Sequence, residues 1–131
     1  MVKLGNCIRV TDTILLPNGE RVKVDCNVET NLQALIQTQN ATIERVQMYQ
    51  KDPTNEDARA ALYRAFSAFL KAILGTKNYE TALAAYDGRA DELCEQLDEW
   101  AGEEVAPKIV EASKKRMEKN KRNARRMKRF A

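Results

Sequence analysis

The chain of 131 residues contains no histidine. That absence excludes histidine-based catalytic triads, histidine metal ligands and histidine acid–base catalysis. No run approaches the roughly 18 uninterrupted apolar residues that a membrane span requires. The N-terminal stretch also lacks the apolar run of a signal peptide. The length suits one small domain with one hydrophobic core, and we expect a soluble, cytoplasmic protein.

Cysteine and glycine are also scarce, with three cysteines and five dispersed glycines. Cys7, Cys26 and Cys94 show no CxxC spacing, which argues against a structural zinc site. A Cys7–Cys26 bridge across a hairpin is one alternative, and three reduced thiols packed as small apolar side chains are the favoured one. No glycine-rich phosphate loop, GxSxG motif or nucleophile beside a base is present. We therefore expect no enzyme activity, no cofactor and no metal.

Acidic residues gather between positions 91 and 104. Catalytic carboxylates need burial, or a like-charged neighbour inside a cleft, to separate their pKa values. On a helix these acids lie opposite Leu93, Leu97 and Trp100, which is typical of a solvated helix face.

The net charge of +3 conceals a strong asymmetry. Residues 114–129 hold ten Lys or Arg and one Glu, a local charge of +9, which leaves residues 1–113 at −6. We expect one acidic domain over residues 1–113 and a basic C-terminal tail over residues 114–131.

The predicted fold is mainly α (α+β), with an N-terminal β-hairpin over residues 1–27 and four to five helices over residues 28–113. Val22, Val24 and Cys26 alternate with charged residues, and Pro17-Asn18-Gly19-Glu20 is a good hairpin turn. Two strands alone are marginal in water, so the apolar face must pack on helices or on another subunit. An open strand edge would offer a docking or self-association surface.

Helical periodicity starts near residue 29, where one apolar stripe comprises Leu32, Leu35, Ile36, Ile43 and Val46. After Pro53, Thr54 is the expected N-cap of a second helix, and Gly75 is expected to end that helix. The second helix should be the central core helix, with apolar residues Ala58, Ala61, Leu62, Ala65, Phe66, Phe69, Leu70 and Ile73. We expect a short helix from Asn78 to about Tyr86 and another over residues 91–101. A break near Gly102 should follow, with Pro107 in the first turn of a last helix.

Five aromatic residues are the candidate partner-binding set: Phe66, Phe69, Tyr79, Tyr86 and Trp100. Their helical spacing favours core packing. The alternative is that part of the set forms a groove for a partner helix.

The candidate electrostatic residues of the tail are Lys114, Lys115, Arg116, Lys119, Lys121, Arg122, Arg125, Arg126, Lys128 and Arg129. They are compatible with salt-sensitive nucleic-acid binding, although no interleaved aromatic residues support base stacking. They are equally compatible with binding an acidic protein surface, including the body of a neighbouring copy. A solvated helix end or extension that keeps the molecule soluble is the third alternative.

The stretch FSAFLKAILGTKNYETALAAYDG (66–88), followed by APKIVEASKKRMEK (106–119), resembles the small tail assembly chaperones of siphophages and prophages of Gram-positive bacteria. The shared pattern is an apolar helix that ends at Leu74-Gly75 and an aromatic-led helix that closes with Tyr86-x-Gly88. An acidic amphipathic helix and a Pro-x-Ile segment at Pro107 follow and lead into a Lys/Arg-rich tail. The match covers roughly the C-terminal half of the chain, and the N-terminal hairpin is not part of it.

The resemblance implies a non-catalytic role in host cytoplasm during phage assembly. Such chaperones bind the long helical tape-measure protein, keep it soluble and help to recruit tail-tube subunits to it. Many are also made in a longer, frameshifted form. The alternatives are a small nucleic-acid-binding protein that uses the basic tail, and a structural phage tail or connector component.

Overall fold

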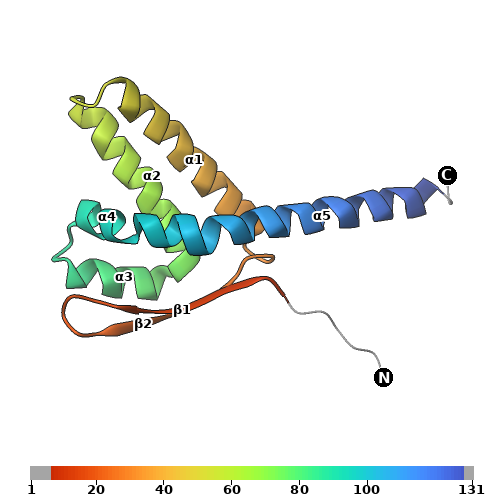
Figure 1. The fold of residues 1–131 in the computed structure, drawn as a ribbon, viewed down its shortest axis with the longest axis horizontal. Helices are drawn as coiled ribbons and strands as arrows, with labels where there is room; N and C mark the ends of the chain where they lie inside the picture. The colour runs from red at the N-terminus through yellow and green to blue at the C-terminus, as the bar shows by residue number, and fades with distance from the viewer. Residues whose placement is uncertain (1–6, 129–131) are drawn as a thin grey trace.

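A computed structural model describes residues 7–128 of the chain as a mainly α fold with an N-terminal antiparallel β-hairpin (Figure 1). Strands β1 (Arg9–Leu15) and β2 (Arg21–Asn27) pair over their full lengths. In the turn, the Leu16 N–H donates to the Glu20 carbonyl over 2.8 Å, and Gly19 has a φ of +86°. The hairpin and its turn confirm the sequence-based prediction.

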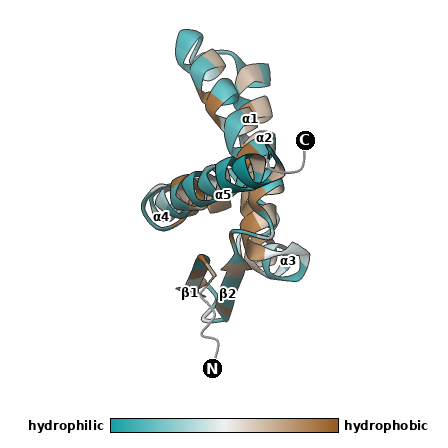
Figure 2. Ribbon diagram, turned by 90° about the vertical axis from the view of Figure 1, so that its right-hand side faces the viewer, coloured by the Kyte–Doolittle hydropathy of each residue, from teal (hydrophilic) through white to brown (hydrophobic). Residues whose placement is uncertain are grey.

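One face of the hairpin supplies the bottom of the core. Val10, Val22, Val24 and Cys26 are buried on that face, as the alternation predicts. The helices lie above it, with α3 (Thr76–Ala85) over one side and α4 (Ala90–Trp100) over the other (Figure 2). A hydrogen bond fixes each of these contacts: Asn78 Nδ2 of α3 donates to the Lys23 carbonyl of β2, and Trp100 Nε1 of α4 donates to Asp12 of β1.

Helices α1 (Leu32–Lys51) and α2 (Glu56–Leu74) form an antiparallel pair that rises away from the hairpin (Figure 1). Asn55, and not Thr54, caps α2, because the Asn55 side-chain oxygen accepts a hydrogen bond from the Ala58 N–H at 3.1 Å. Thr54 instead donates its hydroxyl to Asp52. The prediction of Thr54 as the cap is therefore wrong by one residue.

The core lies where α2 meets the hairpin and the C-terminal helix. Phe66, Phe69, Leu70, Ile73 and Leu74 of α2 are all buried, which confirms α2 as the central helix. The apolar stripe of α1 behaves differently along its length. Leu32 and Leu35 are buried and Ile36 and Val46 are half-buried, but Ile43 is 48% exposed, so only the first part of the stripe enters the core.

Gly75 sets the sharp corner between α2 and α3 (Thr76–Ala85). It has φ of +84° and ψ of 158°, a backbone conformation that is essentially restricted to glycine. The corner lets α3 turn back toward the hairpin and place Ala82 in the core.

The C-terminal helix is continuous where a break was predicted. It comprises α4 (Ala90–Trp100), a π-helical segment η1 (Ala101–Val105) and α5 (Ala106–Met127). In η1 the Ala106 N–H donates to the carbonyl of Ala101, five residues back. Pro107 does lie in the first turn of α5, but the chain remains helical past Gly102. A proline ring collides with the carbonyl four residues earlier in a regular α-helix, and the wider π turn relieves that collision.

The domain boundary expected at residue 113 coincides with no interruption, because α5 runs through it. The three cysteines are free. Cys26 and Cys94 are buried as small apolar side chains, whereas Cys7 is exposed.

Substitution by alanine should change the free energy of unfolding in opposite directions at Gly75, between α2 and α3, and at Gly102, in η1. We expect Gly75→Ala to destabilise the protein by about 1–3 kcal/mol, because alanine is strained at that φ and ψ. Gly102→Ala is the matched control. Its Cβ meets nothing within 4 Å, and it should stabilise the helix by about 0.5–1 kcal/mol. Urea unfolding of both variants checks the signs, and equal effects would contradict the corner geometry.

Candidate functional site

The C-terminal half of α5 projects from the body as a basic helical arm (Figure 1). We define the basic arm as residues 114–128. Ile109 and Ala112 are the buried residues of α5, and every residue from Lys114 to Lys128 is exposed. The arm holds nine Lys or Arg and one Glu. At about 1.5 Å per residue it extends for roughly 22 Å.

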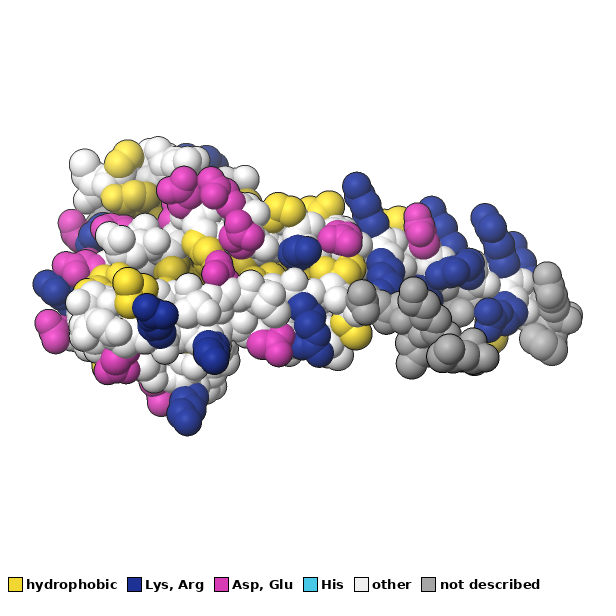
Figure 3. All heavy atoms as spheres, turned by 60° about the horizontal axis from the view of Figure 1, so that its bottom comes forward, with side chains coloured by type: hydrophobic (Ala, Val, Ile, Leu, Met, Phe, Trp, Pro, Cys, Tyr) yellow, Lys and Arg dark blue, Asp and Glu magenta, His cyan; other side chains and the backbone are white. Residues whose placement is uncertain are grey.

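The charges of the molecule are separated in space. Figure 3 shows mostly Lys and Arg side chains along the projecting end, whereas the body carries most of the Asp and Glu side chains among further Lys and Arg. Between Ala90 and Val105 the same long helix carries seven acidic residues and no Lys or Arg. One unbroken helix therefore has an acidic half and a basic half.

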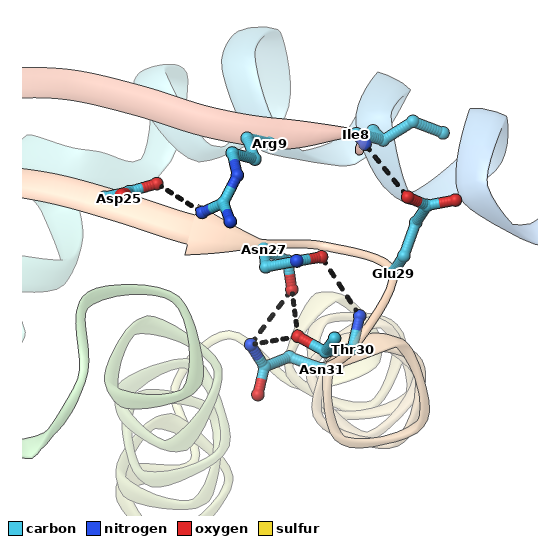
Figure 4. Close-up of polar contacts among 7 residues, drawn as sticks. All are labelled: Ile8, Arg9, Asp25, Asn27, Glu29, Thr30 and Asn31. Atoms are coloured by element: carbon cyan, nitrogen blue, oxygen red, sulfur yellow. Dashed lines mark hydrogen bonds and ion pairs between the residues drawn. The ribbon is translucent and has the colours of Figure 1, made fainter. Parts of the chain in front are cut away.

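Glu29 anchors the base of the arm through an ion pair with Lys115. It follows β2 in a turn where Asn27 accepts hydrogen bonds from Thr30 and Asn31 (Figure 4). One carboxylate oxygen of Glu29 accepts from the Ile8 N–H at 3.1 Å, and the other pairs with the Lys115 ammonium. The hydrogen bond from Lys115, more than that from Ile8, lowers the pKa of Glu29. This carboxylate thus joins the start of the hairpin to the arm.

An open groove lies on the body, between α1 and α2 on one side and α4 and η1 on the other. It consists of two adjoining hollows of about 200 Å³ and 400 Å³. Both hollows are lined by Thr42, Val46, Phe66 and Asp98. The larger one includes Ile43, the exposed residue of α1. We call this feature the acid-rimmed groove, because Glu95 and Asp98 stand on its edge above an apolar floor.

Tyr63 and Glu95 close one end of the groove. The Tyr63 hydroxyl donates to Glu95 Oε1 at 2.8 Å, and the Arg59 guanidinium lies 5.0 Å from the centre of the Tyr63 ring. Burial, followed by this hydrogen bond and the charge of Glu95, raises the pKa of Tyr63 to about 12. Burial also raises the pKa of the nearby Cys94 thiol. Both groups stay protonated at neutral pH, so neither is an activated nucleophile.

The five candidate aromatic residues do not gather at one place. Phe66 and Phe69 line the groove and meet edge to face at 6.2 Å, with most of each ring buried. Tyr79 and Tyr86 pack against the core from α3 and the turn after it, away from the groove lining. Trp100 packs against the core and bonds to Asp12 at the hairpin.

Nine of the ten candidate basic residues lie on the arm as exposed side chains: Lys114, Lys115, Arg116, Lys119, Lys121, Arg122, Arg125, Arg126 and Lys128. The tenth, Arg129, lies outside the described residues. Lys115 is engaged with Glu29 inside the chain.

Sequence reasoning missed three contributors to this site: Ile43, Tyr63 and Glu29. Ile43 matched the core periodicity of α1, and no sequence signal marks the point where α1 leaves the core. Tyr63 is next to Leu62 but is not a member of the apolar stripe of α2, and its partner Glu95 is distant in sequence. Glu29 lies in an ordinary turn, and its role depends on a helix 86 positions later.

Within residues 7–128, no group of three or more Cys, Asp or Glu side chains is arranged to hold a metal ion. None of the helices in that range combines the length and the apolar character needed to cross a bilayer. Comparison with protein-family models, curated proteins and solved structures gave no match.

The Glu29–Lys115 contact predicts a pH effect with a defined sign. Because its folded-state pKa is lowered, Glu29 stabilises the fold above its ordinary pKa, and this contribution is lost as pH falls through the lowered value. We expect Lys115→Met to move the pKa of Glu29 back toward its ordinary value, as measured by NMR titration of the side-chain carboxyl. Lys114→Met removes the same charge one residue away and should leave that pKa nearly unchanged. An unaltered titration in Lys115→Met would contradict the ion pair.

Proposed function

We propose that this chain is a non-catalytic phage tail assembly chaperone that holds a helical tape-measure-like protein and helps to recruit tail-tube subunits in host cytoplasm. The observation that carries the proposal is the open, apolar, acid-rimmed groove beside an exposed basic arm. These two surfaces lie on one small domain. The resemblance over residues 66–119 supports the same role.

The groove has the features that an amphipathic helix needs. Such a helix inserts side chains at i, i+3, i+4 and i+7 into an apolar channel. Ile43, Val46 and Phe66 supply the apolar contacts, and Asp98 at the edge suits a cationic side chain on the polar face of the partner. The groove is shallow and open, so the contact would be reversible.

The basic arm adds a second point of contact. Lys115 is paired with Glu29, and the other eight cationic side chains of the arm can pair with acidic segments of the partner that lie outside the groove. Because a rigid helix joins the two surfaces, binding at one surface raises the effective concentration of the partner at the other. A long, repetitive helical partner can hold several copies in this way, and each copy can still leave when the tail polymerises.

A matched pair of substitutions on α1 tests the groove. Ile43 and Met48 are 48% and 47% exposed, and only Ile43 lines the groove. We expect Ile43→Asp to reduce pull-down of a co-expressed tape-measure protein by at least about tenfold, because it places a charge in the apolar channel. Met48→Asp adds the same charge and should retain binding. If both variants keep the partner soluble, the groove is not the binding site.

The exposed arm also favours a second candidate function, nucleic-acid binding. A binder of this kind should lose affinity linearly in a plot of log affinity against log salt, with a slope of about −0.9 for each phosphate neutralised. We expect the chaperone to show at most weak binding of this kind at physiological salt, measured by fluorescence anisotropy with labelled duplex DNA. Tight binding that falls with the slope of several phosphates would favour the nucleic-acid function. Detection of the chain in purified particles would favour a structural tail or connector component.

A further inference from the structure

We propose that the basic arm of one copy docks in the acid-rimmed groove of a second copy, so that the chain associates with itself from arm to groove. This inference does not rest on the proposed chaperone function, because it requires no other protein. It follows from the shape, length and charge of two surfaces that one chain carries at opposite ends.

The arm carries an exposed apolar stripe, whose first part borders a hollow beside Leu32 and Ile36 of α1 and whose far end projects beyond the body. Met117, Ala124 and Met127 are seven and three positions apart and share one side of the helix. Met117 is 57% exposed and Met127 is 71% exposed. Unbranched methionine side chains adapt readily to an irregular apolar surface. A stripe of this kind on a helix with nine cations is a basic amphipathic surface.

The groove matches that stripe in length and chemistry. Along the long helix it extends from Cys94 to Ala106, a distance of about 18 Å at 1.5 Å per residue. The segment from Met117 to Lys128 is about 16.5 Å long at the same rise per residue, which is close to that length. Ile43 and Val46 offer apolar contacts to the methionines, and Glu95 and Asp98 lie where flanking Lys or Arg side chains would reach.

The helix dipole does not account for the charge pattern of the long helix. Acidic residues near the start and basic residues near the end do stabilise a helix, but the effect fades within the first and last turns. Here nine cations occupy 15 residues, and Lys121–Arg125 and Arg122–Arg126 are like-charged pairs at i, i+4, which destabilise an isolated helix. An acidic surface from outside the arm would relieve that repulsion.

The arm cannot reach the groove of its own chain. The groove lies beside α4 and η1, and the arm leaves in the opposite direction along the same unbroken helix (Figure 1). The occupant of the groove must therefore come from another molecule. Each copy offers one arm and one groove, so the contact either closes between two copies or continues as a chain.

Sedimentation velocity over a range of concentrations, on nuclease-treated protein at low salt, tests the proposal. We expect the mass of the wild-type protein to rise above that of a monomer with concentration. At about 1 M salt, where the screening length falls to about 3 Å, the association should weaken. A wild-type protein that stays monomeric throughout would overturn the proposal.

Charge-reversal variants identify the two surfaces. An arm variant, Lys121→Glu with Arg125→Glu, and a groove variant, Glu95→Lys with Asp98→Lys, should each weaken self-association by at least about tenfold. The control, Glu103→Lys with Glu104→Lys, makes the same charge change on exposed residues of η1 outside the groove lining. The control should associate more strongly than the groove variant.

Mixing the arm variant with the groove variant gives the decisive result. In the mixture each arm meets a groove of opposite charge, so association should return to near the wild-type level. A mixture that remains monomeric, or a control that loses as much association as the groove variant, would overturn the proposal. Binding of a tape-measure protein is not part of this assay, so its outcome leaves the chaperone function to its own test.

Discussion

The arrangement depends on one constraint, the continuity of the helix from Ala90 to Met127. Its buried residues Leu93, Leu97, Ala101, Val105 and Ile109 recur every four positions. At 3.6 residues per turn, each step overshoots by about 40°, so four steps would turn Ile109 roughly 160° from Leu93. The π turn at Ala101–Val105 has more residues per turn than an α-helix, so each residue rotates by a smaller angle and the accumulated rotation is reduced. Both halves of the helix therefore keep their apolar side on the same core.

This continuity sets where the groove and the arm can be. Because the helix does not bend back, its acidic half borders the groove and its basic half projects beyond the body. The contact of Glu29 with Lys115 braces the helix near the point where it leaves the body. The small net charge of +3 is thus the sum of two opposed surfaces that are far apart. A partner or a second copy would meet a strongly basic surface on the arm and a body in which acidic side chains outnumber basic ones.

Local signals were sufficient for the hairpin and for α2. Alternation and the Asn18-Gly19 turn specify the first, and eight apolar positions at helical spacing specify the second. The continuous C-terminal helix was not predictable in this way, since Gly102 and Pro107 are both ordinary signals of a helix end. Burial of Val105 and Ile109 outweighs those signals, and burial is a property of the whole fold. The same holds for the groove, because periodicity assigns Ile43 to a face and does not say what covers that face.

The proposed arm-to-groove association would have a regulatory consequence. If an arm occupies the groove, a helical partner must displace it, and the free energy of self-association is subtracted from that of partner binding. Because the proposed contact pairs exposed cations of the arm with Glu95 and Asp98, it would be weakened by salt and by any nearby acidic segment. A partner with an apolar helix and adjacent acids would compete at both surfaces at once. Such competition would keep the apolar grooves covered by arms while no partner is present, and the partner would expose a groove only by displacing the arm.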